Sequence, residues 1–256
     1  MSETNNLPLA NLKDEALRLL STAGQQQITL RLFGGMAVHL RCPATNLPGL
    51  KRSYGDLDYI TDWASLSNLE HFFKIAGYQP DRTLNTLYGD RRQLYFDEIN
   101  HRQVDILVDT FEMCHTIPLG KRLKVDEFTL PLSELLLTKA QIVEMNRKDV
   151  LDMCAMLVDH ASASEDGELI NLPVIQALCS DDWGLFTTVT ENLTMVYQMV
   201  KNAEIKLSDE ISFILLTRLS EMNQALVSCP KTAGWKMRAL IGKRMSWFEE
   251  VEEIRR

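Results

Sequence analysis

The period of the apolar residues changes near Pro131, and this change restricts the chain to few architectures. Before Pro131, short apolar runs bounded by glycine, proline or asparagine indicate strands, and segments of helical period separate them. After Pro131, nearly every segment repeats its apolar residues every three or four positions, as amphipathic helices do. The pattern predicts an α+β fold, with strands and helices in residues 1–130 and an all-helical domain in residues 131–256.

The first part of the chain contains both kinds of element. Helical period is found at residues 7–23, 36–41 and 65–76. Strand patterns are found at residues 28–33, 57–61 and 104–111, and residues 124–130 are a further candidate strand. Two β-prone runs at residues 83–88 and 93–98 flank Gly89-Asp90, so we expect a hairpin there.

The second part is predicted to be helical throughout. We expect helices at residues 132–145, 147–160, 172–202, 208–227 and 233–255. Residues 161–171 are mostly small and polar and are the best candidate for a linker. Basic and aromatic residues are interleaved between Lys231 and Trp247. A solvated helix face explains this stretch better than an RNA-binding surface does, because an acidic run follows it at residues 249–253.

The composition argues against several classes of protein. A formal net charge of −8 argues against a protein that coats nucleic acid by bulk electrostatics. The five cysteines form no Cys-x-x-Cys pair and the five histidines show no metal-ligand spacing, so we expect neither a disulfide framework nor a zinc site. No apolar run has the length needed to cross a bilayer, and the polar N-terminus is not typical of a signal peptide. These features predict a cytoplasmic protein without a membrane partner.

Three aspartates carry the strongest functional signal. Asp56 and Asp58 lie at the start of a predicted strand, where side chains two residues apart share a face and are separated by ~7 Å. Asp105 lies inside the apolar run 104–108, where a charged side chain requires a partner or a cation. Asp109 shares the face of Asp105 by strand period and is the alternative. We prefer Asp105, because Asp109 is nearer the end of the strand.

Carboxylates that converge in a protein need a cation to remain ionised together. Hard oxygen ligands favour Mg²⁺ or Mn²⁺, and Mg²⁺ commonly binds together with phosphates. Upstream, Gly34-Gly35 lies between a predicted strand and a predicted helix. There, glycines allow close approach of the backbone to a ligand, and the helix offers free N–H groups to an anion. The residues therefore predict metal-assisted phosphoryl or nucleotidyl chemistry.

Gly34-Gly35, the stretch 52–59 and Asp105 together resemble the catalytic core of the nucleotidyltransferases of the DNA polymerase beta-like superfamily. Among these, the chain is most similar to the minimal and AbiEii-type prokaryotic nucleotidyltransferases. Two later stretches resemble the first helices that follow the core in those proteins, at residues 132–139 and 147–152. The resemblance covers about residues 25–160. It implies a nucleotidyltransferase-like mixed sheet flanked by helices in residues 1–130.

The resemblance also implies a reaction. Such a protein moves a nucleoside monophosphate from a nucleoside triphosphate to a hydroxyl group and releases pyrophosphate. Asp56, Asp58 and Asp105 would be the catalytic residues and the ligands of two Mg²⁺ ions, with Asp105 orienting or deprotonating the attacking hydroxyl. The acceptor would be a small molecule, a protein side chain or a tRNA end. The chain departs from the family pattern at Gly35, where many members have serine, and at Tyr54, where many have serine or threonine.

Five residues are expected to bind the nucleotide. Gly34 and Gly35 would do so through their backbone N–H groups, and Arg52 is the basic residue nearest the acids. Lys139 and Lys148 carry ammonium groups that suit the distributed charge of a triphosphate. The alternative for Lys148 is an ordinary set of solvated helix pairs with the acidic residues four positions before and after it, Glu144 and Asp152.

Two further hypotheses remain open at this stage. In the first, the chain has the same fold but is catalytically idle and serves as a binding or regulatory module, for example as one half of a toxin–antitoxin pair. The presence of all three acids favours activity over this alternative. In the second, the chain is an unrelated α+β structural domain, and the three motifs coincide by chance. Residues 172–256 carry no chemistry that the sequence reveals.

Overall fold

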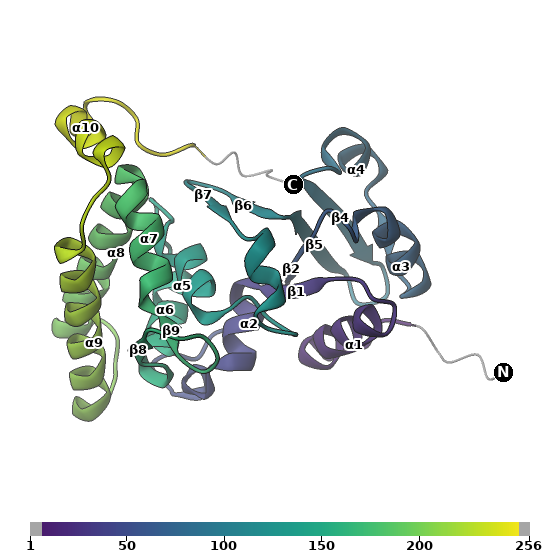
Figure 1. The fold of residues 1–256 in the computed structure, drawn as a ribbon. Helices are drawn as coiled ribbons and strands as arrows, with labels where there is room; N and C mark the ends of the chain where they lie inside the picture. Colours follow the sequence, from purple (N-terminus) through teal and green to yellow (C-terminus); the bar gives the residue numbers. More distant parts are fainter. Residues whose placement is uncertain (1–6, 251–256) are drawn as a thin grey trace. The chain divides into compact units, whose positions relative to one another are not determined.

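The computed structural model describes residues 7–250, which have an α+β fold (Figure 1). Contacts between Cα atoms divide the chain into two compact units. The first unit contains the described residues of Met1–Leu40, Ser53–Phe111 and Pro118–Leu130, and the second contains those of Arg41–Arg52, Glu112–Ile117 and Pro131–Arg256. The second unit thus includes two short segments from the first half of the sequence, which no sequence pattern predicted.

A mixed five-stranded sheet forms the centre of the first unit, in the order β1-β2-β5-β4-β3. Its strands are β1 (Leu30–Phe33), β2 (Leu57–Thr61), β3 (Gln79–Pro80), β4 (Arg92–Asp97) and β5 (Arg102–Val108). The central pair, β2 and β5, is parallel, and the other three pairs are antiparallel. The strand predicted at residues 57–61 is confirmed with both of its limits.

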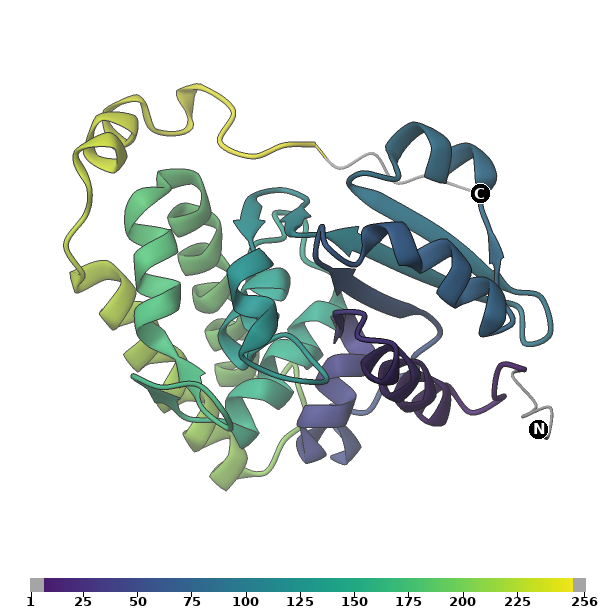
Figure 2. The same ribbon diagram turned by 45° about the vertical axis from the view of Figure 1, so that its right-hand side comes forward.

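Helices cover one face of this sheet. Figure 2 shows α1 (Leu12–Gln25) and α3 (Leu69–Ile75) on the same side of the strands. On that face, the hydroxyl of Tyr59 donates a hydrogen bond to the carbonyl oxygen of Ala16 in α1, at 3.3 Å. The ring of Phe73 in α3 stacks on that of Tyr95, with 4.3 Å between centroids. The alternation of buried and half-buried residues along β5 shows that the opposite face is the more open one.

The predicted hairpin at residues 83–98 is wrong. Only its second half is a strand, and the first half is the helix α4 (Arg82–Tyr88). Asp81 caps this helix: its side chain accepts a hydrogen bond from the backbone N–H of Leu84 at 3.0 Å. An aspartate cap satisfies a backbone donor that is otherwise unpaired at a helix start. Local capping therefore outweighs the strand preference of Thr83 and its neighbours.

Several predicted limits in the first unit also change. The first helix begins at Leu12 rather than residue 7, because the side chain of Asn11 caps it, and it continues past Gly24. The helix expected at residues 65–76 begins with a 3₁₀ turn, Leu66–Asn68, and Ser65 does not cap it. Instead, the hydroxyl of Ser65 accepts a hydrogen bond from the backbone of Thr29.

The candidate strand at residues 124–130 is replaced by other structure. A 3₁₀ segment, Gly120–Lys124, comes first. An isolated parallel bridge then joins Thr129 to Leu32 in β1. The helix predicted at residues 36–41 is α2, which begins two residues earlier (Gly34–Arg41). A small two-stranded sheet, β6 (Thr110–Glu112) and β7 (Thr116–Pro118), follows the main sheet in the chain.

The second unit is mainly helical. Its helices are α5 (Leu132–Ala140), α6 (Arg147–Asp159), α7 (Leu172–Asp181), α8 (Trp183–Lys201), α9 (Asp209–Ser228) and α10 (Ala233–Ile241), and two 3₁₀ segments are Pro43–Asn46 and Gly242–Arg244. The helix predicted at residues 172–202 is divided at Asp182, whose side chain caps α8 by accepting hydrogen bonds from the N–H groups of Gly184 and Leu185. The helix predicted from residue 233 ends at Ile241, and residues 251–255 of that prediction lie outside the described residues.

The segment 161–171 is part of the second unit rather than a connection between two bodies. It contains the short parallel strands β8 (Ser162–Ala163) and β9 (Ile170–Asn171). Ile170 is completely buried, and its N–H donates to the carbonyl of Ala161 at 3.0 Å. The composition of the segment suggested a linker, but one apolar residue near its end fixes it to the unit.

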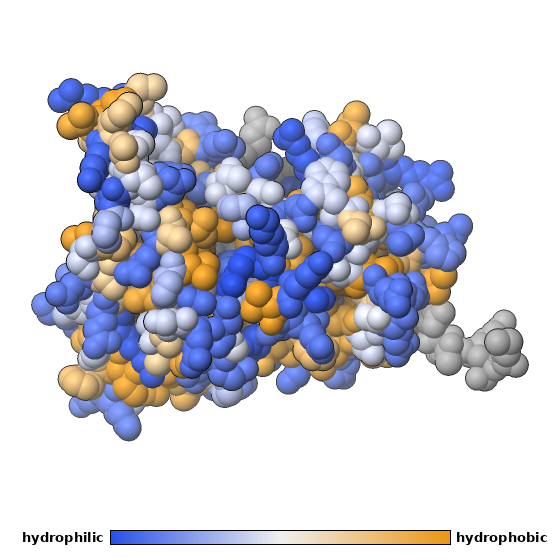
Figure 3. Space-filling model, viewed as in Figure 1, coloured by the Kyte–Doolittle hydropathy of each residue, from blue (hydrophilic) through white to orange (hydrophobic). Residues whose placement is uncertain are grey.

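Met237 and Leu240 on α10 are large apolar side chains that remain exposed, and this hydrophobic patch is visible at the upper left of Figure 3. All five cysteines are free thiols, four of them buried, in agreement with the sequence prediction. Among the helices within residues 7–250, none combines the length and the apolar character required to span a membrane.

Candidate active site

Two of the three predicted acids are neighbours in the sheet of the first unit. Asp58 on β2 and Asp105 on β5 are directly paired in the parallel register. Paired residues on adjacent strands project from the same face, with the strands ~4.8 Å apart. The residues that flank Asp58 and Asp105 on both strands point to the other face and are buried. The two aspartates therefore lie side by side on the more open face of the sheet.

Gly34 lies against the first of these acids. Phe33, the last residue of β1, is the antiparallel partner of Asp58, and Gly34 follows it with a positive φ of 66°. A Cβ atom built on Gly34 would stand 2.2 Å from Oδ2 of Asp58, which is an impossible contact. Glycine is thus required here for two reasons: the backbone conformation, which L-residues rarely adopt, and the space that the Asp58 carboxylate fills. Gly34, Asp58 and Asp105 form a continuous row, which we call the acid row.

Asp56 immediately precedes β2 rather than lying on it. The strand β2 begins at Leu57, so the alternation of a strand does not determine the direction of the Asp56 side chain. Asp56 is exposed and lines a cavity of about 660 Å³ together with Gln103, Phe96 and Gln79, which follow one another across the sheet. Within residues 7–250, no three His, Cys, Asp or Glu side chains are already assembled as metal ligands.

Arg92, a residue that the sequence analysis missed, holds Asp105. Its Nε lies 2.8 Å from Oδ1 and 3.1 Å from Oδ2 of Asp105, and its Nη2 also contacts Oδ2. The hydrogen bond to Asp105 raises the pKa of the Arg92 guanidinium, and the negative charges of Asp105 and Asp58 act in the same direction against the effect of burial. The sequence signal was an arginine at the start of an apolar strand, but only the strand register brings it to Asp105.

The alternative acid, Asp109, occupies a different position. It follows the end of β5, has a positive φ of 56°, and donates its N–H to the carbonyl of Thr61. Burial raises the pKa of its carboxyl group. The residue that is paired with Asp58 is therefore Asp105 and not Asp109.

Two of the expected nucleotide-binding residues belong to a buried ion network in the second unit. Arg52 binds both oxygens of Asp152, with two contacts of 2.7 Å, and Lys139 lies 3.1 Å from Asp152 and 2.9 Å from Asp149. None of these four side chains is more than 12% exposed. Burial acts to lower the pKa of Lys139, but Asp152 and Asp149 outweigh it, so the pKa is raised.

The predicted surface pairing of Lys148 is also corrected. Because α6 begins at Arg147, Glu144 precedes the helix, and Asp152 is buried in the ion network rather than paired with Lys148. Lys148 itself is exposed in the first turn of α6. The structure therefore gives Arg52 and Lys139 a structural role in the second unit, whereas the acid row and Gly35 belong to the first.

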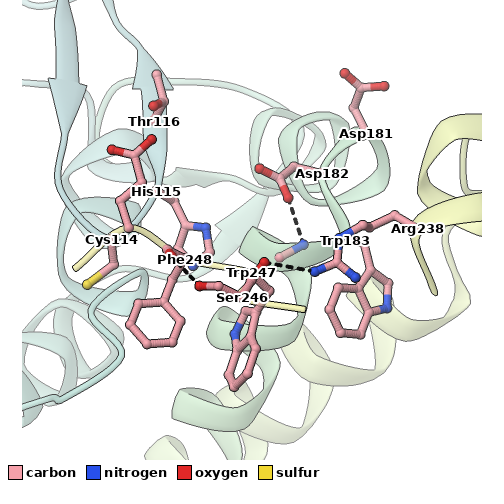
Figure 4. A pocket seen from close by; sticks show the side chains of 12 residues that line it. Cys114, His115, Thr116, Asp181, Asp182, Trp183, Arg238, Ser246, Trp247 and Phe248 are labelled. Atoms are coloured by element: carbon pink, nitrogen blue, oxygen red, sulfur yellow. Dashed lines mark hydrogen bonds between the residues drawn. The ribbon is translucent and has the colours of Figure 1, made fainter. Parts of the chain in front are cut away.

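A second cavity, of about 530 Å³, lies within the second unit (Figure 4). Aromatic side chains of Trp183, Trp247 and Phe248 line it, but cations of the same unit already cover two of these rings. Arg238 lies 4.8 Å from the ring centre of Trp183, and Lys243 lies 4.6 Å from that of Trp247. Arg238 also donates hydrogen bonds to the carbonyls of the segment that carries Trp247. Arg238 and Lys243 of this stretch thus lie against aromatic rings of the same unit, whereas the sequence pattern predicted a solvated helix face.

Comparison of the chain with models of known protein families and with curated protein sequences finds no match. The family resemblance therefore stays a prediction.

Proposed function

We propose that the protein is a metal-dependent nucleotidyltransferase, which moves a nucleoside monophosphate from a nucleoside triphosphate to a hydroxyl acceptor. One observation carries this proposal: the register pairing of Asp58 with Asp105, with Gly34 packed against Asp58. The pairing concentrates negative charge on the open face of a sheet, at the point where the chain passes from β1 into α2. Such a position suits a ligand that combines a divalent cation with phosphates.

The donor set fits Mg²⁺ or Mn²⁺. Carboxylate oxygens are the hard ligands that both ions prefer, and Asp58 and Asp105 supply two neighbouring carboxylates. Arg92 already places a positive group against Asp105, which indicates that this position stabilises a cation. Asp58 and Asp105 would hold the metal, and Asp56, which lines the cavity beside Gln103, would complete the set. When bound, the metal stabilises negative charge on phosphate oxygens.

The residues of the chain have separate tasks in this proposal. Asp105 orients the attacking hydroxyl and accepts its proton, because it is a carboxylate on the open face of the sheet. Gly34 and Gly35 present backbone N–H groups at the start of α2, where an anion is favoured. Arg52 and Lys139 have no assigned task, since their charges are neutralised by Asp149 and Asp152. The acceptor remains a small molecule, a protein side chain or a tRNA end.

A second candidate function has one observation in its favour. The guanidinium of Arg92 binds both oxygens of Asp105. If this pairing is permanent, the protein has the fold without the reaction and acts as a binding or regulatory module. Such a module need not turn over nucleotides.

Nucleotide binding tests the site that the enzyme requires. We propose to measure the melting temperature with ATP, GTP, CTP and UTP, each with and without Mg²⁺. The wild type is compared with the Asp58→Asn, Asp105→Asn double variant and with a control that loses the same charge at two exposed sites, Asp14→Asn and Asp90→Asn. A ligand that binds the folded state raises its stability by mass action.

The expected result is a Mg²⁺-dependent rise in melting temperature in the wild type and the control, and no rise in the Asp58, Asp105 variant. The absence of any rise in the wild type, or an equal rise in all three proteins, would contradict the proposed site.

A further inference from the structure

The contact between Arg92 and Asp105 places a cation of the chain itself at the acid row. We propose that Arg92 is an internal counter-ion that a divalent metal must displace from Asp105 in order to bind. The inference rests on the proposed function, because it concerns the regulation of the same site. It predicts that Arg92 weakens metal binding, which is the opposite of what a ligand or a supporting residue would do.

The geometry of the contact makes the two cations competitors. The guanidinium uses both carboxylate oxygens of Asp105 through Nε and Nη2, so neither oxygen faces the site without a bound donor. This forked arrangement is the strongest form of arginine–carboxylate pairing. A metal ion that took an oxygen of Asp105 would stand next to the guanidinium, and two positive charges at that distance repel each other. Metal binding and the Arg92 contact therefore exclude one another.

The position of Arg92 in the sheet allows it to leave. Asp105 is paired with Leu94 on β4, and Arg92 is paired with Leu107, so the arginine reaches Asp105 diagonally across the face. Arg92 is the first residue of β4, and its side chain is 40% exposed, compared with 16% for Asp105. A long, partly solvated side chain at a strand end can move into water without disturbing the buried face. The acid, by contrast, remains fixed in the centre of the sheet.

The negative charge near Arg92 explains why the contact forms without metal. Asp58 and Asp105 are neighbours, and two carboxylates so close together repel unless a cation lies between or beside them. Both acids favour the charged form of Arg92. The arginine thus stabilises the acid row in the metal-free protein, and its release gives up that stabilisation each time a metal binds.

Titration with Mn²⁺, followed by the electron paramagnetic resonance signal of the free ion, measures the competition without any enzymatic activity. Five proteins are compared: the wild type, Arg92→Gln, Arg92→Lys, Asp58→Asn, which removes a proposed metal ligand, and Arg91→Gln as the control. Arg91 is the exposed neighbour of Arg92, so its replacement removes the same charge from the same region without touching Asp105. The Arg92→Lys variant retains the positive charge but cannot form the bidentate contact with both carboxylate oxygens of Asp105.

We expect Arg92→Gln to lower the dissociation constant for Mn²⁺ by about tenfold, within the usual range of coupling between two binding events in one protein. Arg92→Lys should give a smaller decrease, and Arg91→Gln should leave the constant within about twofold of the wild type, as expected of a screened surface charge. Far-ultraviolet circular dichroism shows whether Arg92→Gln folds. If it does not fold, the dissociation constant of the Arg92→Lys variant tests the proposal instead, and a decrease relative to the wild type supports it.

The outcomes separate this inference from the proposed function. An unchanged or larger dissociation constant in Arg92→Gln and Arg92→Lys, together with Mn²⁺ binding that Asp58→Asn removes, overturns the counter-ion role and leaves the metal site intact. An absence of Mn²⁺ binding in the wild type and in every variant overturns both. Binding in Arg92→Gln but not in the wild type supports the counter-ion role, and it favours the catalytically idle module.

Discussion

The carboxylate of Asp58 fills the space that a side chain on Gly34 would require. The distance from a Cβ at Gly34 to Oδ2 of Asp58 would be 2.2 Å, and the neighbouring Cγ and Cβ atoms of Asp58 would lie at 3.1 and 3.3 Å. From the sequence alone, this glycine is explained by the close approach of an anionic ligand to the backbone. The structure adds a reason that acts even without a ligand, because Gly34 determines where one of the two paired acids can stand.

Replacing Gly34 with alanine should therefore displace Asp58 as well as strain the backbone. We expect Gly34→Ala to lower the free energy of unfolding by about 1–3 kcal/mol, the usual cost of one strained backbone residue. It should also weaken Mn²⁺ binding. Urea denaturation and Mn²⁺ titration measure the two effects. The control is Gly24→Ala in α1, where an added Cβ meets nothing within 4 Å and stability should not fall. Wild-type metal binding in Gly34→Ala would contradict the role given to this glycine.

Asp152 holds two buried cations, Arg52 and Lys139, so its charge is needed for the stability of the second unit. We expect Asp152→Asn to lower the free energy of unfolding by about 3–5 kcal/mol, because it leaves buried positive charge without its partner. Lys148 is exposed, so Lys148→Ala should change the free energy of unfolding by less than about 0.5 kcal/mol. Denaturation in urea gives both values. A loss below about 1 kcal/mol in Asp152→Asn would show that the network is not structural.

His115 predicts a pH dependence of stability. Burial lowers its pKa in the folded protein, against the opposing charges of Asp182 and Glu249, and its Nε2 lies 2.8 Å from the hydroxyl of Thr188. Above a pH of about 6.5, the ordinary pKa of histidine, His115 is neutral in both the folded and the unfolded protein, so its full contribution to stability is present. As the pH falls below that value, the unfolded chain takes up the proton first, so stability is lost towards the lower pKa of the folded state.

The comparison of His115→Gln with the wild type isolates this effect from the carboxylates. Between pH 7.5 and 5.5, the free energy of unfolding should fall more in the wild type than in His115→Gln. The matched change at the exposed His71 in α3 should leave the wild-type dependence unaltered. If the free energy of unfolding changes equally with pH in the wild type and in His115→Gln, His115 is not the source of the pH dependence.

Local sequence patterns predicted the positions of individual strands in the first unit. The position of β2 follows from its β-forming residues, such as Tyr59 and Ile60, and the placement of Asp105 on a strand follows from its apolar neighbours. Local capping was the main cause of error. Asp81 caps a helix at residues whose pattern resembles a strand. Asp182 caps α8 in the middle of a long helical pattern, which therefore forms two helices.

Relationships between distant segments were beyond the reach of the sequence pattern. The contact of Arg92 with Asp105 depends on how β4 and β5 are aligned, and periodicity along one strand does not contain that information. The pairing of Arg52 with Asp152 joins residues 100 positions apart and turns an expected phosphate ligand into a structural residue. The same reason explains why residues 41–52 belong to the second unit although their sequence resembles an ordinary loop.

Transfer of a radiolabelled α-phosphate is the most direct test of the account. The protein is incubated with each of the four nucleoside triphosphates, with Mg²⁺ or Mn²⁺, and with fractionated small molecules, proteins and tRNA as acceptors. We predict that label becomes covalently attached in one acceptor fraction with the wild type, with pyrophosphate released in equal amount, and that the Asp58→Asn, Asp105→Asn variant attaches none. No attachment by the wild type in any fraction, although the nucleotide binds, would contradict catalysis and leave the paired aspartates as a binding site alone.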